Sequence, residues 1–284
     1  MHKDLLYILV VLSVSGLWGC APDEPYNLPK GESAYLHRVL EYCPAPGQFV
    51  NVLPEYEAGD DASSMAAKCT AALADNARGT VTLGGWGGYM TFAFDHPIRN
   101  IAGERDFSIS GNAFTMNGNA AYGSSEPGIV LVSRDVNKNG MADDEWYELA
   151  GSEYASPETE HFYTYTYTRA GDTVRNAFHK QPYYPEWYGD SCTFTGSLLA
   201  VHQERVSNQY VVRTPDYGYA DNKPNTDTTG IGMDIGWAVD AGGRSVSLPY
   251  IDFVRVYTAV QDCNDITGEL STEITGAEDL HWRN

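Results

Sequence analysis

Positive charge is scarce in this chain: 18 Lys and Arg residues stand against 38 Asp and Glu residues, and the formal net charge is −20. A surface this acidic repels phosphate backbones and anionic lipids, so we expect no nucleic-acid partner and no electrostatic attachment to a membrane. Catalytic signatures are missing as well, because the chain has no GxSxG, HExxH or P-loop pattern and no GxGxxG that opens a helix. These absences favour a binding protein over an enzyme.

Long hydrophobic runs are missing after residue 20. The apolar stretch Leu5–Trp18 is shorter than the about 20 residues of a membrane-spanning helix, and it ends in Leu17–Cys20, which resembles a bacterial lipobox. We therefore expect residues 1–19 to be a lipoprotein signal peptide and the lipid on Cys20 to be the only membrane attachment. Asp23–Glu24 resembles the export signal of Bacteroides-type lipoproteins, which predicts a cell-surface lipoprotein of the outer membrane.

Cysteine is rare, and none of the cysteines forms a CxxC motif, which argues against a zinc ribbon or a thioredoxin-type site. Apart from Cys20, the chain has Cys43, Cys69, Cys192 and Cys263. An even number of cysteines in an exported protein predicts disulfides. All connectivities are open, and the pairs Cys43–Cys69 and Cys192–Cys263 close the shortest loops.

Glycine, tyrosine and proline are plentiful, with 28, 20 and 14 residues, and this composition favours strands and turns over helix bundles. One helix is predicted over Ala62–Asn76, where Met65, Cys69 and Leu73 recur on one face. Elsewhere apolar residues alternate with the period of a strand. The expected strands are Val81–Leu83, Tyr89–Phe94, Phe107–Ser110, Gly128–Ser133, Trp146–Leu149, Phe162–Thr168, Leu198–His202, Tyr210–Arg213, Met233–Val239 and Ile251–Ala259.

Short strands at this spacing predict an all-β fold, a jelly-roll-like β-sandwich with one short N-terminal helix. In the last expected strand, Phe253, Arg255 and Tyr257 share one face, opposite to the valines between them. Residues 20–45 are rich in proline and are expected to form a tether, with a short helical turn near Ser33–Leu40. Residues 46–284 contain no internal repeat, so we expect them to form a single β-sandwich domain that binds a ligand.

The sharpest local motif is the oxygen-rich segment 135–145. Its side chains at loop positions one, three and five and its glycine at position six match the start of an EF-hand-type calcium loop. Trp146 replaces the usual Glu at position twelve and no helix precedes the segment, so we expect a Ca²⁺ loop between two strands; an Asx-rich turn without an ion is the alternative. The candidate ligands are Asp135, Asn137, Asn139, Met141 through its carbonyl, Asp143 and Glu145.

The sequence gives Glu148, just after this motif, no catalytic partner. On a strand, Glu145 and Glu148 point to opposite faces, whereas the carboxylates of a glycosidase must converge within about 5–10 Å. Asp144 shares a face with Glu148, but no signature of a sandwich glycosidase surrounds the two. Asp95–His96 lies at a strand end and is interpreted as a pair that stabilises a turn.

Aromatic residues crowd three predicted loops. Gly84–Tyr89 presents a tryptophan on a turn with four glycines, and the segments Gln181–Tyr188 and Tyr217–Tyr219 are rich in tyrosine. Rings in loops at one end of a sandwich bind planar or sugar-like ligands by stacking, although sandwiches also bury aromatic residues in their cores. The candidate ligand-binding residues are Trp86, Tyr89, Tyr183, Tyr184, Trp187, Tyr217 and Tyr219.

Several segments carry a combined resemblance to a known family: Tyr42–Asn51, Thr82–Tyr89, Phe92–His96, Glu126–Ile129, Asp143–Tyr154 and Ile251–Thr258. Together they resemble a family of Bacteroidetes cell-surface lipoproteins, often labelled "cell surface protein" or PKD-domain-associated. The resemblance extends from about Tyr42 to Leu280. Members of the family are encoded near TonB-dependent outer-membrane transporters, some of them in uptake loci for corrinoids, the vitamin B12 type of nutrient.

The resemblance implies a surface lipoprotein that captures a scarce nutrient without catalysis and passes it to a TonB-dependent transporter. A corrinoid is the first expectation for the ligand. The alternative is a carbohydrate-binding module or a glycan-active surface protein on the same sandwich. An adhesion or structural protein with calcium-stiffened loops is a third interpretation.

Overall fold

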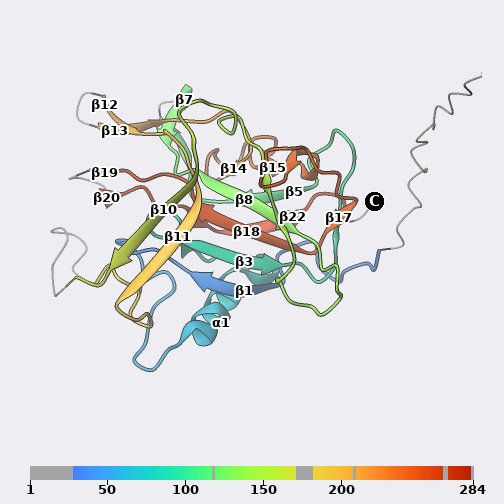
Figure 1. Cartoon of the computed structure of the whole chain (residues 1–284), viewed down its shortest axis with the longest axis horizontal. Coiled ribbons are helices and arrows are strands. Elements are labelled where there is room, and N and C mark those ends of the chain that lie inside the picture. Colours follow the sequence, from blue (N-terminus) through green and yellow to red (C-terminus); the bar gives the residue numbers. More distant parts are fainter. Residues whose placement is uncertain (1–27, 117–118, 171–181, 207–208, 265–267, 283–284) are drawn as a thin grey trace, which may run out of the picture.

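The computed structural model describes residues 28–282, except 117–118, 171–181, 207–208 and 265–267. The expected signal peptide, residues 1–19, and the expected lipid site, Cys20, lie outside the described residues. The described chain consists mostly of strands with a single α-helix, and its sheets do not close into a barrel (Figure 1). This confirms the all-β, β-sandwich-like class. Within these residues, no helix combines the length and apolar character needed to cross a membrane.

The main sheet has seven strands, and neighbours along its path pair antiparallel. The last long strand of the sequence, β18, lies at its centre between β3 and β8. A short seventh strand, β14, pairs with the start of β8. In spatial order the strands are β1 (Arg38–Cys43), β3 (Tyr89–Ala93), β18 (Phe253–Thr258), β8 (Gly128–Ser133), β9 (Trp146–Leu149) and β16 (Ala238–Val239), with β14 at Tyr219–Ala220.

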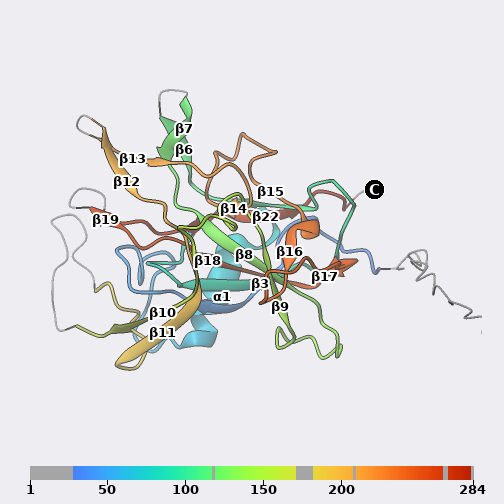
Figure 2. The same cartoon turned by 45° about the horizontal axis from the view of Figure 1, so that its top comes forward.

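Smaller sheets surround the main sheet. One has the order β15 (Gly232–Met233), β5 (Phe107–Ser110) and β22 (Gly276–Asp279), and another has the order β12 (Gln203–Val206), β13 (Gln209–Arg213), β7 (Asn119–Ser124) and β6 (Phe114–Met116). In Figure 2 the second of these extends away from the body of the molecule. The remaining pairs are β10 (Glu160–Thr168) with β11 (Ser191–Leu198), β17 (Tyr250–Ile251) with β4 (Ile98–Arg99), β19 (Cys263–Asn264) with β20 (Gly268–Glu269), and β2 (Val81–Thr82) with β21 (Glu273–Ile274).

The helix α1 (Ala62–Leu73) begins at a capping box, in which the side chain of Asp61 accepts from the Ser64 amide and Ser64 accepts from the Asp61 amide. A 3₁₀ turn, η1 (Ala74–Asn76), follows it. The apolar stripe of α1, Met65, Cys69 and Leu73, is buried, as the spacing predicted. This stripe places α1 against β1, below the main sheet in Figure 1.

The core lies on one face of the main sheet, here called the inner face. Strand alternation sends Phe92, Val130, Val132, Val254 and Val256 into it, and each of these side chains is almost completely buried. The stripe of α1 and the apolar side chains of β5 and β15 complete the same cluster. Burial of this apolar surface is the main force that holds the layers together.

The hairpin β10–β11 crosses the opposite, outer face of the main sheet (Figures 1 and 2). Trp86 attaches it: the fully buried indole donates from Nε1 to the Ser197 carbonyl (3.2 Å) and meets the Tyr163 ring edge-on at 4.8 Å. Tyr167 donates back to the Trp86 carbonyl (3.0 Å). The hairpin is therefore packed onto the sheet by a second, smaller core.

Part of the expected tether belongs to the domain. Residues Arg38–Cys43 form β1, an edge strand paired with β3, where we expected an unstructured tether and a helical turn near Ser33–Leu40. Val39 and Tyr42 are both buried in the core although they are three residues apart, because the register of β1 shifts between Val39 and Glu41, as at a β-bulge.

Other strand predictions were also incomplete. Strand β11 was missed, and the expected strand Leu198–His202 is wrong beyond Leu198, where β11 ends. The expected strand Met233–Val239 is interrupted by the 3₁₀ turn η2 (Ile235–Trp237).

The expected disulfides are not formed, because Cys43, Cys69, Cys192 and Cys263 are all free. Cys69 lies on the buried stripe of α1 in the main core, whereas Cys43 packs on the outer face beside the Trp86 cluster. Cys192 lies beside that same cluster, but Cys263 is exposed on β19. Each expected pair would join residues from different environments. The shortest-loop argument used only the separation of the cysteines in the sequence, which contains no information about their environments.

Candidate ligand-binding cleft

A cleft of about 770 Å³ lies between the outer face of the main sheet and the hairpin β10–β11. Strand alternation produces it, because the neighbours of the core residues point here. From the sheet it is lined by Tyr89, Leu131, Trp146, Glu148, Arg255 and Tyr257. From the hairpin and the nearby turns it is lined by Tyr154, His161, Phe162, Thr193, Phe194, Thr195, Gly196, Ser197 and Val239–Gly243.

Arg255 occupies the centre of the sheet side of the cleft. Its guanidinium lies over the rings of Tyr89 and Trp146, 4.5 and 4.4 Å from their centroids. The same group donates to Glu41 Oε2 (2.6 Å) and to Thr91 Oγ1 (2.8 Å). Cation–π contacts and an ion pair thus hold the two rings in fixed positions, ready to stack on a ligand.

Phe162 is displayed at the edge of the cleft by an irregularity in β10. The register of β10 against β11 shifts between Glu160 and Tyr163, as at a β-bulge, and Phe162 has a φ of 60°. A left-handed conformation is costly for an aromatic residue, and here it leaves the ring 68% exposed. An apolar ring held in this way at a cleft is typical of a binding site.

Glu148, Ser197 and His161 form a chain of hydrogen bonds inside the cleft. Ser197 Oγ lies 2.9 Å from Glu148 Oε2 and 3.0 Å from His161 Nδ1. His161 Nε2 lies 3.1 Å from the Tyr154 carbonyl. Burial raises the pKa of Glu148 to about 7, although the hydrogen bond from Ser197 acts in the opposite direction.

Asp240, the other carboxylate in the cleft, is already fully engaged. Its Oδ1 accepts from the amides of Gly242 and Arg244, and its Oδ2 accepts from the Arg244 side chain. These hydrogen bonds, led by the one from the Arg244 side chain, lower the pKa of Asp240. Asp240 thus shapes its own turn and offers little capacity to a ligand.

Trp86, predicted to stack on a ligand, is instead a buried anchor of the hairpin. The glycine-rich turn that carries Trp86 has a packing reason. A Cβ on Gly84, whose φ is 69°, would lie 1.9 Å from the Ala45 carbonyl oxygen, and one on Gly88 would lie 2.0 Å from that of Leu83. The glycines therefore permit close approach of two backbone segments.

The tyrosine-rich segment around residues 182–188 packs on the protein and lies outside the cleft. Trp187 stacks on Tyr42 at 5.8 Å, and the ring of Tyr184, only 5% exposed, lies under the guanidinium of Arg169. The Tyr183 carbonyl accepts from the Gly47 amide (2.9 Å). These rings cover the end of the core.

Of the last two predicted residues, Tyr219 is buried and Tyr217 is 41% exposed beside Trp237, 5.0 Å away. Neither lines the cleft. Tyr89 is therefore the one predicted ligand-binding residue that the structure brings to the cleft. Most of the other cleft residues come from strands, and strand positions were not considered as binding positions in the sequence.

The predicted calcium loop connects β8 to β9, directly before Trp146 and Glu148 of the cleft. Asp143 accepts from the amide groups of both Asn137 and Asn139, and Asp135 accepts from the backbone amides of Asn139 and Gly140. Four of the predicted ligands are therefore gathered on one turn. Of the other two, Met141 is 59% exposed, and Glu145 accepts from the Tyr147 hydroxyl (2.9 Å).

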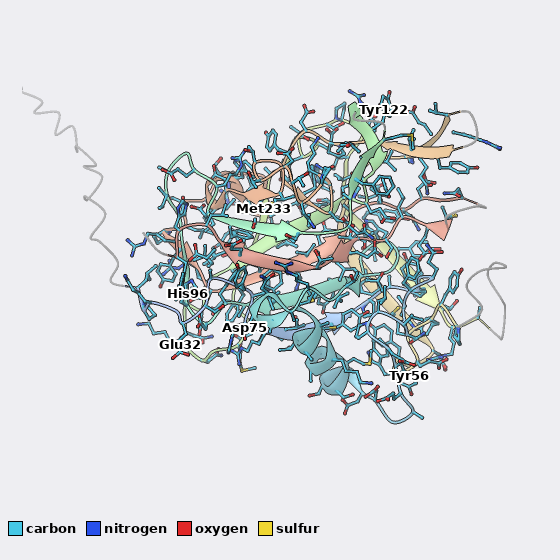
Figure 3. The ribbon with its side chains drawn as sticks, turned by 180° about the vertical axis from the view of Figure 1, so that it is seen from behind. Glu32, Tyr56, Asp75, His96, Tyr122 and Met233 are labelled. Atoms are coloured by element: carbon cyan, nitrogen blue, oxygen red, sulfur yellow. The ribbon has the colours of Figure 1, made fainter. Side chains whose placement is uncertain are left out.

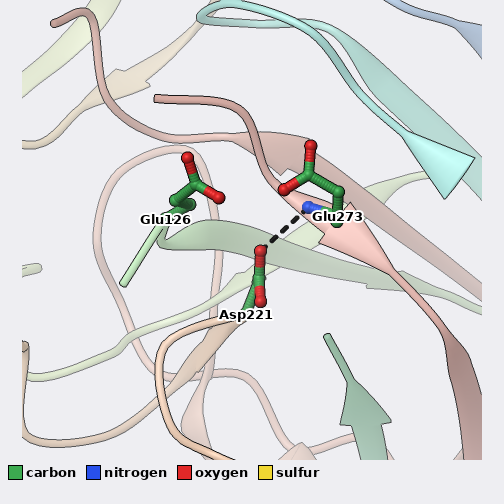
Figure 4. Close-up of side chains that lie close together, drawn as sticks. All are labelled: Glu126, Asp221 and Glu273. Atoms are coloured by element: carbon green, nitrogen blue, oxygen red, sulfur yellow. Dashed lines mark hydrogen bonds between the residues drawn. The ribbon is translucent and has the colours of Figure 1, made fainter. Parts of the chain in front are cut away.

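A second acidic group lies outside the lining of the cleft: one carboxylate oxygen each of Glu126, Asp221 and Glu273 falls within 4.8 Å of the others (Figure 4). Asp221 Oδ2 accepts from the Glu273 amide (2.9 Å), and Glu126 Oε1 accepts from the Ser271 amide (3.2 Å). Burial and then the charge of Glu273 raise the pKa of Asp221 to about 8, and burial raises the pKa values of the other two. Such a group can share protons or hold a divalent cation.

His96, interpreted as part of a turn, joins both ends of the described chain. Its Nδ1 lies 2.6 Å from Asp95 Oδ1 and its Nε2 lies 2.8 Å from Asp279 Oδ2, while Asp95 also accepts from the Glu32 amide. Glu32 and His96 lie near each other at one edge of the molecule (Figure 3). Burial opposes the charged form, but the hydrogen bonds to Asp279 and Asp95 outweigh it and raise the pKa of His96. The role is structural.

A scan of the chain against models of protein families finds no match, and a search of curated proteins finds no similar sequence. The cleft must therefore be interpreted from its own chemistry. It combines rings, hydroxyl groups and one carboxylate of raised pKa in a partly enclosed space, the composition of a site for a small or medium-sized polar ligand.

Proposed function

We propose that this protein is a surface lipoprotein that captures a scarce nutrient in the cleft and delivers it to a TonB-dependent outer-membrane transporter. The observation that carries the proposal is the cleft itself, in which six aromatic side chains surround a few polar groups. The first candidate ligand is a corrinoid, which has broad apolar ring faces and a rim of neutral amides. An edge of the corrin would enter the cleft, with its faces against the rings and its amides near the polar groups.

The proposed capture is non-enzymatic, and two features of the cleft support this. Glycoside hydrolysis needs two available carboxyl groups, but Asp240 is engaged by its own turn. Nucleophilic catalysis by Ser197 would need a histidine oriented by an acid. Here His161 donates to a carbonyl, the acid contacts the serine, and Ser197 is 5% exposed.

Calcium in the loop between β8 and β9 belongs to the same proposal. Asp135, Asn137, Asn139 and Asp143 would supply hard oxygen ligands, as Ca²⁺ prefers. The ion would fix the loop that leads into β9, and hence the positions of Trp146 and Glu148. It has a structural role here and takes no part in ligand exchange.

A glycan is the second candidate ligand, favoured by the hydroxyl groups that line the hairpin side. Thr193 and Thr195 line the cleft beside the ring of Phe162, and sugars are held by stacking with a few hydrogen bonds. A carbohydrate-binding module on this sandwich would use the same residues. Direct comparison of the two ligand classes separates these candidates.

The experiment is isothermal titration calorimetry of the purified protein with cyanocobalamin and, in parallel, with a panel of neutral oligosaccharides. The chain offers a matched pair of variants, because Phe162 and Phe114 are both exposed, at 68% and 58%, and only Phe162 lines the cleft. We expect Phe162→Ala to weaken binding about tenfold and Phe114→Ala to leave it unchanged. Binding of oligosaccharides alone would favour the second candidate, and binding of neither would refute capture by the cleft.

Anchoring at the cell surface is tested separately. We expect Cys20→Ala to leave the protein without lipid and release it from the outer membrane. A variant that stays with the membrane after high-salt washing would contradict the lipid anchor.

A further inference from the structure

We propose that Glu148 is the specificity-determining residue of the cleft, and that it selects neutral ligands whose amide or hydroxyl groups donate a hydrogen bond to its Oε1. This inference rests on the proposed function and names the chemical class that the cleft accepts. It is carried by the chain of hydrogen bonds through Ser197 and by the charges around it.

The first step places the protons in the chain of hydrogen bonds that joins Glu148, Ser197 and His161. The Tyr154 carbonyl can only accept, so the proton on that side is on His161 Nε2. The Ser197 hydroxyl has a single proton, yet its oxygen is within hydrogen-bond distance of both Glu148 Oε2 and His161 Nδ1. With the ring proton on Nε2, His161 Nδ1 accepts the Ser197 proton, and Glu148 Oε2 must then carry the proton of the second bond; once Glu148 is ionised, the Ser197 hydroxyl donates to Oε2 instead.

The two forms of this chain of hydrogen bonds differ by one proton, and the ionised form carries a negative charge on Glu148. One oxygen of Glu148 is committed to Ser197 in either case, and the structure shows no hydrogen bond to Oε1 from the described residues. Oε1 is therefore the acceptor that the chain leaves for a ligand. The serine and the histidine position it but need not touch the ligand.

The second step concerns the surrounding charges. The titratable and charged groups that face Glu148 are His161 and Tyr154 on the hairpin side, Arg255 and Tyr257 on β18, Tyr219 on β14 and Asp240 in the turn after β16. Arg255 is already paired with Glu41, and Asp240 with Arg244. Each guanidinium is thus already paired with a carboxylate, so neither brings an uncompensated positive charge to a ligand carboxylate or phosphate.

An anionic group beside Glu148 would therefore meet a carboxylate in a partly buried site without a free cation, and would be repelled. A neutral donor would instead form a charge-assisted hydrogen bond to Oε1, which is stronger than a bond between neutral groups. The net charge of −20 on the whole protein also disfavours anionic ligands. The cleft accordingly favours neutral polyamides or polyols over acids.

The test measures the affinity for cyanocobalamin, a neutral corrinoid with amide side chains, by calorimetry between pH 6 and pH 8. Burial places the pKa of Glu148 at about 7, so the carboxylate is mostly protonated at pH 6 and mostly ionised at pH 8. We expect the wild type to bind about tenfold more tightly at pH 8 than at pH 6. Glu148→Gln should bind about tenfold more weakly than the wild type at pH 8 and lose the pH dependence.

Glu160→Gln is the matched control, because Glu160 is an exposed residue of β10 that does not line the cleft. It should behave as the wild type at both pH values. Ser197→Ala provides a second variant: it removes the donor that stabilises the carboxylate, so the midpoint of the pH dependence should move to higher pH. Thermal unfolding of each variant confirms that it is folded.

The selected class is tested with monocarboxylic acid derivatives of cyanocobalamin, in which one amide is replaced by a carboxylate. We expect at least one of them to bind the wild type about tenfold more weakly than the parent compound, and Glu148→Gln to reduce this difference. Equal binding of all derivatives, or unchanged binding by Glu148→Gln at pH 8, would overturn the inference while leaving capture intact. Absence of any binding by the wild type would instead overturn the proposed function and this inference with it.

Discussion

The two faces of the main sheet are made by the same strands, yet they differ in almost every property. On the inner face, Phe92, Val130 and Val254 are dry and packed against α1 and β5. On the outer face, Glu148 and Arg255 lie among half-buried rings below a hairpin that covers them only in part. Successive residues of one strand thus belong to the core and to the cleft.

Under the proposed function, this difference separates stability from binding. The inner face buries most of its apolar surface and is sensitive to any change in volume. The outer face holds polar groups by local pairs, such as Arg255 with Glu41, so its residues can be changed at a lower cost to folding. Each prediction below tests one side of this comparison.

The largest difference in stability is expected when one phenylalanine of the core and one at the edge of the cleft are each changed to alanine. Phe92→Ala should lower the free energy of unfolding by about 3–5 kcal/mol, because it leaves a cavity in a closed core. Phe162→Ala, at the edge of the cleft, should change it by no more than about 0.5 kcal/mol. Urea unfolding of both variants measures the difference, and similar losses would contradict the division of roles.

A smaller effect is expected from the loop that leads into the outer face. At a Ca²⁺ concentration of 100 times its Kd, one bound ion adds about 2.7 kcal/mol of stability. Chelation by EDTA should therefore lower the melting temperature of the wild type but not that of the double variant Asp135→Ala, Asn137→Ala. Asp216→Ala, an exposed acidic residue outside the loop, should keep the response. A wild type that is insensitive to both Ca²⁺ and EDTA would refute the calcium loop.

The smallest effect on stability is expected from the acidic group formed by Glu126, Asp221 and Glu273. The pKa values of Glu126, Asp221 and Glu273 are raised in the folded state, so the native protein binds more protons than the unfolded chain. Their contribution is fully present below the unfolded pKa values of about 4 and is lost as the pH rises through the folded values, about 8 for Asp221. With EDTA present, we expect the protein to be less stable at pH 8 than at pH 5.

Glu126→Gln should weaken this pH dependence. The amide oxygen can still accept from Ser271 and the new NH₂ can donate to Glu273, so the variant should be more stable than the wild type at pH 8, by on the order of 1 kcal/mol. Glu160→Gln serves as the exposed control. Lower stability of Glu126→Gln in buffer without chelator, reversed by EDTA, would show instead that the three carboxylates hold a cation.

Local sequence patterns predicted the parts of the fold that local physics determines. The four-residue spacing of Met65, Cys69 and Leu73 gave the buried face of α1, and alternation gave the bounds of β5, β8 and β9. Strand β11 was missed because Ser191–Leu198 is mostly small and polar, and it pairs with β10 largely outside the core. Strand β1 was missed because its proline-rich surroundings suggested a tether.

The site was harder to predict than the fold. Trp86 was assigned to a ligand because its glycines suggested an open turn, whereas close approach of Ala45 to Gly84 requires them. The cleft was missed because Glu148, Ser197 and Arg255 come together only through long-range strand pairing. The alternation in Phe253–Thr258 did place Arg255 and Tyr257 on one face, and this was the available signal for the cleft.

The central position of β18 has a consequence for the order in which the molecule can assemble. Strands β3 and β8 do not pair with each other, because each forms its hydrogen bonds with β18 between them. Until Phe253–Thr258 has been synthesised, the preceding strands have no template on which to complete the main sheet. The chain is therefore expected to remain without its central sheet until its last tenth emerges, with slow folding dominated by distant contacts.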